Sequence, residues 1–213
     1  MMTADNIESI ESVLAFWFGA DVDAAGNDAN TVAGRQSGLW WGKDAAVDQT
    51  IKTRFEASLL AARDNKLDDW AESPAGLLAL TLLLDQFPRN IYRDSATAFD
   101  FDELARQCCH LGLAQGYDQQ LPPLQRVFFY LPLEHSEDVE DQEHCVQLFR
   151  ALAKHMAKED PASRETFDGY LKFADRHHAI VARFGRFPHR NAILGRDSTA
   201  EEIAFLKEPH SSF

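Results

Sequence analysis

Residues 73–90 read SPAGLLALTLLLDQFPRN, the most strongly apolar part of the chain and the best indication of its architecture. Ser73 and Pro74 are typical of a helix start, because serine caps the first turn and proline lacks only an N–H that has no partner there. The leucines between residues 77 and 84 cover the whole circumference of that helix. We therefore expect a central helix from Pro74 to Phe87.

Apolar residues recur at helical spacing through most of the remaining chain. The segments are 7–17, 44–62, 100–115, 122–131, 136–156, 163–184 and 198–206. The stripe Tyr170, Phe173 and His177 runs beside a second one in segment 163–184, so that helix should pack against more than one neighbour. No segment alternates with a period of two, and the sequence predicts an all-α fold of roughly seven to nine antiparallel helices.

One domain over residues 1–213 is expected, because no Pro/Gly/Ser-rich stretch divides the chain. Residues 20–38, ADVDAAGNDANTVAGRQSG, are small and polar without periodicity, and they predict a long, mobile loop. Hydrophobic residues make up 45% of the chain, with 15 Phe and 4 Trp. A core of that size needs neither disulfides nor a structural metal.

The net charge of −13 argues against nucleic acids and anionic membranes as partners, because it repels polyanions. The first six residues lack the pattern of a signal peptide, and the longest apolar run, 76–84, is too short to span a bilayer. Three cysteines without a CxxC pattern are typical of reduced thiols. These features together predict a cytoplasmic protein.

A Phe-Pro-(His)-Arg-Asn corner occurs twice, within segments 85–90 and 185–191. Proline moves the residue before it away from the helical conformation, so Phe87 and Phe187 are each expected to end a helix. The arginine then sits on a stiff turn, where its planar fork can bind a carboxylate or a phosphate. We expect the two corners to converge on one anion site, with candidate ligand-binding residues Arg89, Asn90, Arg186, Arg190, Asn191 and Asp85. The alternative is structural, with each arginine bonded to the carbonyls of its own helix end or paired with a carboxylate such as Asp85.

A second polar segment, LEHSED over residues 133–138, places Glu134 and His135 just outside a predicted helix start. His135 could act as an acid or base near neutral pH with Glu134 orienting it, and His189 in the second corner is a further candidate. Ser136 is expected to cap the helix that follows. No HExxH pair, ExxH pair or Gly-rich phosphate loop is present, so neither a metal nor a cofactor is expected.

The two corners and the LEHSED segment make the chain similar to a large, mostly bacterial family, domain of unknown function family 924. The matching stretches also include FWFG at 16–19, WGKD at 41–44, LDDW at 67–70 and LGR at 194–196. The resemblance implies an all-helical superhelix like that of tetratricopeptide repeats, and it supplies no activity. The chain lacks the repeat signature of those proteins and any clear period of 34 residues.

Three functions remain open from the sequence, and so does the oligomeric state. The leading hypothesis is a helical binding module for an anionic small molecule or a peptide carboxylate. The second is an enzyme acting on a small anionic substrate, with His135 or His189 as the acid-base group. The third is a protein-interaction scaffold in which the polar cluster is structural. Arginines paired with internal carboxylates favour the scaffold, whereas unpaired guanidiniums in a pocket beside a histidine favour the enzyme.

Overall fold

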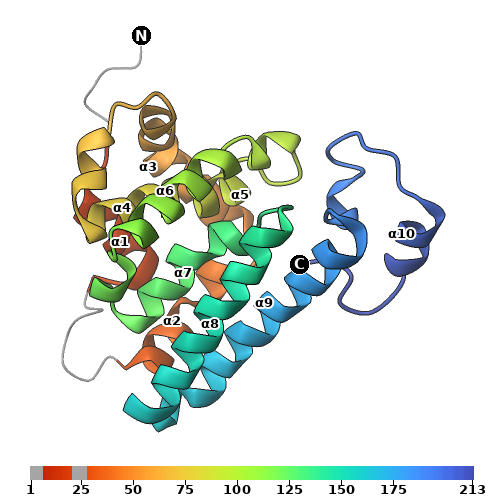
Figure 1. Cartoon of the computed structure of the whole chain (residues 1–213). Helices are drawn as coiled ribbons and strands as arrows, with labels where there is room; N and C mark the ends of the chain where they lie inside the picture. The colour runs from red at the N-terminus through yellow and green to blue at the C-terminus, as the bar shows by residue number, and fades with distance from the viewer. Residues whose placement is uncertain (1–6, 21–27) are drawn as a thin grey trace.

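The computed structural model describes residues 7–20 and 28–213, which form helices and turns without a strand (Figure 1). The α-helices are α1 (Ile10–Phe18), α2 (Ala29–Trp41), α3 (Ala45–Arg63), α4 (Pro74–Thr81), α5 (Phe87–Ile91), α6 (Asp102–Ala114), α7 (Pro123–Glu134), α8 (Val139–Glu159), α9 (Arg164–Phe184) and α10 (Ala200–Phe205). Between them lie the 3₁₀ turns η2 (Asp68–Glu72), η4 (Ala96–Phe99), η5 (Asp118–Gln120), η6 (Pro161–Ser163) and η7 (Pro188–Arg190), and the π-helical turn η3 (Leu82–Gln86). The all-α prediction is confirmed, whereas the tetratricopeptide-like superhelix stays a prediction.

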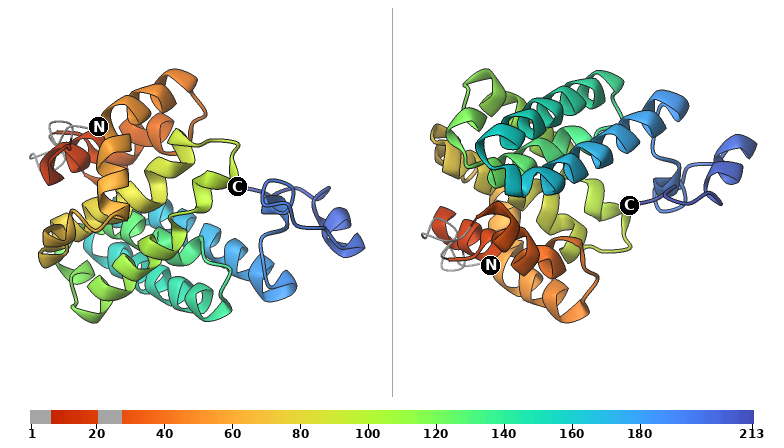
Figure 2. Two further views of the ribbon diagram at one scale, coloured as in Figure 1. Left: turned by 90° about the horizontal axis from the view of Figure 1, so that it is seen from above. Right: turned by 90° about the horizontal axis from the view of Figure 1, so that it is seen from below.

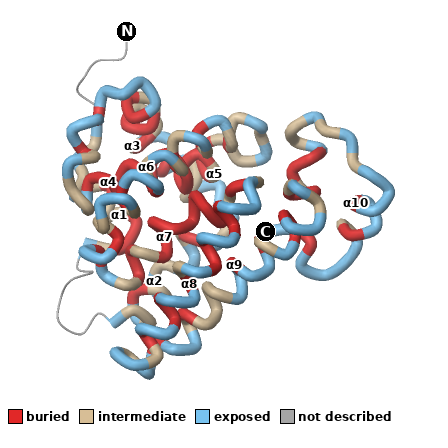
Figure 3. The backbone as a smooth tube through the Cα atoms, in the orientation of Figure 1, coloured by how far each residue is buried: buried red, intermediate tan, exposed pale blue. Residues whose placement is uncertain are grey.

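Helices α4 and α7 form the centre of the molecule. Every residue of α4 from Gly76 to Thr81 is buried, as is almost all of α7 (Figure 3). Helices α1 to α3 lie on one side of α4 and α5, and α7 to α9 lie on the other (Figure 2). Residues 76–81 of α4 are therefore buried on every side of the helix, as the sequence predicts.

The expected helix end at Phe87 is wrong, because helical backbone continues from Pro74 to Ile91. The chain passes Pro88 through the π-helical turn η3, in which the Phe87 N–H donates to the carbonyl of Leu82. Proline normally breaks a helix by clashing with the preceding turn, and one widened π turn relieves that clash. The first corner thus lies inside a helix, with Asp85 and Arg89 one turn apart.

The second corner follows a true helix end, which occurs at Phe184 and not at Phe187. Gly185 adopts the left-handed conformation with φ 66° and donates its N–H to the Val181 carbonyl. Phe187 is extended, as the residue before a proline should be. The two corners therefore share a sequence but not a backbone conformation.

Pro132 does not end α7, which runs two residues further to Glu134. Helical bonding resumes behind the proline, where the His135 N–H donates to the Leu131 carbonyl. The next helix, α8, is capped by Asp138 and not by Ser136. Because α7 extends this far, Glu134 is its last residue and His135 its C-cap, and the last turn that holds them is buried.

The loop predicted over 20–38 is wrong for residues 29–38, which belong to α2; residues 21–27 lie outside the described part of the chain. Asp28 caps this helix by accepting from the Thr31 N–H. The helix is held by tertiary contacts: Val32 and Trp40 are buried, and the Trp40 indole N–H donates to the Trp17 carbonyl at 2.9 Å. Packing of these residues overrides the low helix propensity of the small polar residues between them.

Helices α8 and α9 form a long antiparallel pair, and the chain after α9 forms a separate blue lobe in Figure 1. A small apolar cluster joins the lobe to the end of α9: Ile180 and Val181 of α9 are grouped with Phe187 and Phe205 of the lobe. No helix in the described residues is long and apolar enough to cross a membrane.

Candidate functional site

A cavity of about 820 Å³ lies among the end of α2, α5, η4, the end of α7, the middle of α9 and the lobe that follows α9. Aromatic side chains form much of its wall: Trp40, Trp41, Phe99, Phe149, Tyr170, Phe173 and Phe213. Its polar lining includes Gln86, Arg89, Asn90, Glu134, His135, His177, His189 and Arg190. Both corners and the LEHSED segment therefore contribute to one cavity.

Arg89 of the first corner is fully paired. It donates to both oxygens of Asp102, at 2.9 and 3.2 Å, and to the backbone carbonyl of Asp85 at 2.6 Å. Its guanidinium also lies 3.5 Å from the carboxylate of Asp85. The structural role considered for this arginine, capping carbonyls and pairing with a carboxylate, is the one the side chain performs.

The carboxylate of Asp85 is fully buried and holds His135. His135 Nδ1 lies 2.7 Å from Asp85 Oδ1, and the Gln86 amide donates to the other oxygen. Although burial alone would raise the pKa of Asp85, the charge of Arg89 and the contact with His135 lower it to about 2. Because the carboxylate is ionised, Nδ1 carries the proton and Nε2 of the neutral ring carries a lone pair.

His135 meets the cavity with 16% of its side chain exposed, and its Nε2 has no hydrogen bond to the described residues. Burial and the positive charge of Arg89 lower its pKa, which favours the neutral ring. A neutral imidazole oriented by a buried carboxylate can accept a proton at Nε2. The arrangement can therefore act as a general base.

Glu134 and His177 form a second buried polar pair, and both are uncharged at neutral pH. Burial and the nearby charge of Asp85 raise the pKa of Glu134 to about 8, while burial lowers the pKa of His177 to about 3. His177 Nδ1 donates to the Phe173 carbonyl at 2.9 Å and lies 3.3 Å from Glu134 Oε1. The contact joins a protonated acid and a neutral ring, so it is not an ion pair.

Arg190 is the buried cation of this site whose charge is least neutralised. Its guanidinium packs over the rings of Phe99 and Phe187 and donates to the His135 carbonyl at 3.0 Å. The nearest carboxylate oxygen, on Asp102, is 3.7 Å away and already binds Arg89. Within residues 7–20 and 28–213, the buried Nε of Arg190 has no hydrogen-bond partner. Burial together with the charge of Arg89 lowers the pKa of Arg190 to about 10.

Arg89 and Arg190, from the two corners, thus meet at Asp102, but the other corner residues divide. Asn90 lines the cavity and donates to Asp48 at 2.8 Å. Arg186 and Asn191 do not line it: Arg186 binds both oxygens of Glu202, at 2.6 and 2.8 Å, and Asn191 donates to Ser198. For these two residues the expected place in a shared site is wrong, because both are used to hold the lobe after α9.

His189 lines the cavity next to Arg190. Burial and the charge of Arg190 lower the pKa of His189 to about 4, so the ring is neutral at pH 7. Its buried Nδ1 has no hydrogen-bond partner among the described residues. No carboxylate in the described part of the chain is hydrogen-bonded to His189, whereas Asp85 orients His135, so His135 is the better-placed base of the two.

The sequence alone does not identify Asp102 or the aromatic wall as parts of the site. Asp102 opens α6 and resembles an ordinary acidic first-turn residue, so nothing local marks it as the link between two arginines. The aromatic wall is partly visible in the sequence, because Tyr170, Phe173 and His177 form the second stripe of α9, and this stripe faces the cavity. A helix with two apolar stripes has two partners, and here one of them is a cavity.

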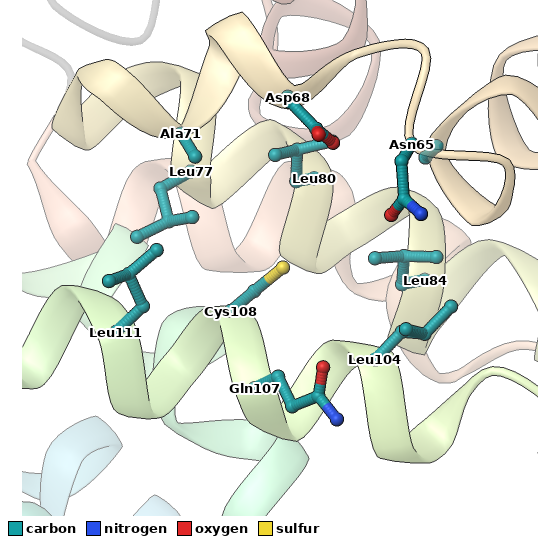
Figure 4. Close-up of a pocket in the computed structure, with 11 residues that line it drawn as sticks. Asn65, Asp68, Ala71, Leu77, Leu80, Leu84, Leu104, Gln107, Cys108 and Leu111 are labelled. Atoms are coloured by element: carbon teal, nitrogen blue, oxygen red, sulfur yellow. The ribbon is translucent and has the colours of Figure 1, made fainter.

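A smaller cavity of about 250 Å³ lies between α4 and α6 and is lined by Leu80, Leu84 and Cys108 among others (Figure 4). Burial raises the pKa of the Cys108 thiol to about 11, so the thiol is protonated and unreactive at neutral pH. Across residues 7–20 and 28–213, no group of three or more His, Cys, Asp or Glu side chains could hold a metal ion. The larger cavity is therefore the candidate site.

Fold and site together define an all-helical protein with a buried acid-base cluster opening on an aromatic cavity. The model of a family described as bacterial proteins of unknown function, DUF924, matches residues 13–210, and the chain belongs to this family. Among solved structures, the chain is similar to the protein of unknown function ATU0120 from Agrobacterium tumefaciens, with 37% identity and a TM-score of 0.74. That match covers 93% of this chain and 96% of the other. No curated protein matches the sequence.

Proposed function

We propose that the chain binds a small organic anion, or the carboxylate of a peptide, in the cavity, with Arg190 as its cationic partner. The observation that carries the proposal is the incomplete pairing of Arg190. A buried guanidinium is normally matched by a carboxylate of its own, because an unpaired buried charge is strongly unfavourable. An anion in the cavity would supply the missing charge.

The shape of the cavity supports a small ligand. Sites for such ligands are typically about 300–1,000 Å³ in volume, mostly apolar, and fitted with a few polar groups. The cavity of about 820 Å³ has this character, with aromatic walls and a polar end made by His135, Glu134 and Arg190. A nucleic acid would not fit it, and the net charge of −13 would oppose one.

A thermal-shift screen with sulfate, phosphate, acetate, succinate and arylcarboxylates tests the proposal. A ligand at roughly 100 times its Kd should stabilise the protein by about 2.7 kcal/mol. Arg190→Lys should raise the Kd of the ligand tenfold or more and so reduce the thermal shift, because an ammonium lacks the planar fork. Arg186→Lys is the matched control, since Arg186 lies outside the cavity, and it should respond like the wild type. Equal responses from both variants would refute the role of Arg190.

The contact between Asp85 and His135 favours a second function, an enzyme that acts on the bound anion. His135 would take a proton at Nε2 from the substrate or from water, and Asp85 would stabilise the imidazolium that forms. The protonated carboxyl of Glu134 would donate a proton in the same cavity. Paired groups whose pKa values are shifted apart by their surroundings are typical of acid-base catalysis.

The enzyme can be tested with a panel of ester, amide and phosphomonoester substrates that carry a carboxylate. Turnover by the wild type should fall by a factor of about 10²–10⁴ in His135→Gln, as expected when a general base is lost. His189→Gln, a neighbour without an orienting carboxylate, serves as the control and should retain most of the activity. Turnover that survives in His135→Gln with an unchanged melting temperature would exclude His135 as the base.

A further inference from the structure

One aromatic ring of the chain already occupies part of the candidate site. The end of the described chain returns to the side of α9 (Figure 1), where the Phe213 ring stacks on His177 with centroids 3.6 Å apart and planes 18° from parallel. The ring also lies 5.9 Å from the His189 ring. Phe213 remains 46% exposed, so it covers the imidazole without being locked into a core.

The imidazole of His177 is a fixed platform for such a ring. Its Nδ1 donates to the Phe173 carbonyl, and the ring makes a T-shaped contact with Phe187 at a centroid distance of 5.5 Å and 78°. Both contacts hold the plane of the ring, and the stack with Phe213 shows that one of its faces accepts an aromatic ring. A neutral, oriented heteroaromatic ring binds another aromatic ring by offset stacking.

Arg190 is close to the His177 ring, because both contact the side chain of Phe187. The guanidinium of Arg190 lies 4.5 Å from the centroid of Phe187, and the His177 ring lies on the same phenyl group. A ligand with an aromatic ring and a carboxylate separated by a short chain would meet both at once. The remaining aromatic wall would exclude water from its ring.

We propose that the anion bound in this cavity is an aromatic carboxylic acid, whose ring takes the place of Phe213 on His177 while its carboxylate meets Arg190. This inference rests on the proposed anion binding and adds the class of ligand. Phe213 is then an internal competitor: the binding-competent state is the one in which its ring has left His177. The apparent affinity of the wild type is lowered by the fraction of molecules in which Phe213 is stacked.

The test compares binding to the wild type, Phe213→Ala and Phe213→Leu by titration calorimetry. The probes are acetate, benzoate, phenylacetate, 3-phenylpropionate, 4-phenylbutyrate and 3-cyclohexylpropionate. We expect Phe213→Ala to bind the best arylalkanoate about three- to tenfold more tightly than the wild type does, which is the range of a ring stack. Phe213→Leu should gain as well, because leucine cannot stack. The arylalkanoate should bind more tightly than its cyclohexyl analogue.

Ile203→Ala is the matched control, since Ile203 lies in the same lobe, is 49% exposed and does not line the cavity. It should bind every probe as the wild type does. Unchanged affinity in Phe213→Ala and Phe213→Leu, or equal affinity for aryl and cyclohexyl acids, would overturn the inference. If acetate or phosphate still bound through Arg190 in that case, the proposed anion binding would hold and only the aromatic class of ligand would be refuted. If no anion bound any variant, both proposals would be refuted.

An aryl group with a carboxylate also occurs at the end of a peptide that finishes in phenylalanine. The calorimetric series therefore includes N-acetyl-Ala-Phe beside 3-phenylpropionate. Tighter binding of the small acid identifies a metabolite site, and tighter binding of the peptide identifies a site for protein ends. Either result supports the ring and carboxylate recognition, and binding of neither overturns it.

Discussion

Replacing Arg190 with methionine should leave the fold at least as stable as before. The pKa of Arg190, about 10 against an ordinary 12.5, means that burial disfavours its charged form by about 3 kcal/mol. The variant also loses the hydrogen bond to the His135 carbonyl, which contributes about 1 kcal/mol. Methionine keeps the packing between Phe99 and Phe187. The free energy of unfolding should therefore stay equal or rise by about 2 kcal/mol.

Arg89→Met is the matched control, because the same substitution in the first corner leaves two carboxylates behind. Asp102 loses two hydrogen bonds, and the buried Asp85 loses the charge that lowers its pKa. Removing one partner of a buried ion pair typically costs roughly 3–5 kcal/mol. Urea unfolding at pH 7 followed by circular dichroism measures both variants. A loss in Arg190→Met as large as that in Arg89→Met would refute the view that Arg190 is held for a ligand.

Two further results are expected. Glu134 keeps its proton in the folded state up to about pH 8, so its contribution to stability is complete below pH 4.5 and is lost as the pH rises through 8. Between pH 5 and 9 the wild type should thus lose roughly 3–5 kcal/mol relative to Glu134→Gln, measured by unfolding at each pH; parallel curves would contradict the raised pKa. Leu83→Ala should cost roughly 2–5 kcal/mol in denaturant unfolding, and Leu80→Ala less, because Leu80 already borders a cavity of about 250 Å³; a smaller loss for Leu83 would place the core elsewhere.

The helices could be predicted from the sequence because their apolar spacing reflects local geometry. The errors fall where tertiary contacts override a local rule. Pro88 should end a helix, but the π turn before it removes the clash, and no residue type marks such a turn in advance. Residues 29–38 lack an apolar stripe, yet α2 forms there because Trp40 docks on Trp17.

The candidate site could be predicted only in part. The meeting of Arg89 and Arg190 follows from the repeated corner, because two copies of one polar motif are most easily satisfied by shared partners. Their partner Asp102 lies outside both motifs and joins them only through the packing of α6. The cavity itself depends on which aromatic side chains fail to fill the space between helices, and that is a property of the whole packed molecule.

The different pairing of Arg89 and Arg190, however, corresponds to a difference in sequence between the two corners. Two residues before the phenylalanine, the first corner has Asp85 and the second has Gly185. In the first corner that carboxylate and its carbonyl lie one helical turn from Arg89 and help to neutralise it. In the second corner the glycine ends α9 and carries no charge. The nearest carboxylate to Arg190 is therefore that of Asp102, which Arg89 already binds. Because the second corner lacks the acid of the first, Arg190 has no carboxylate of its own, and this arginine lines the cavity.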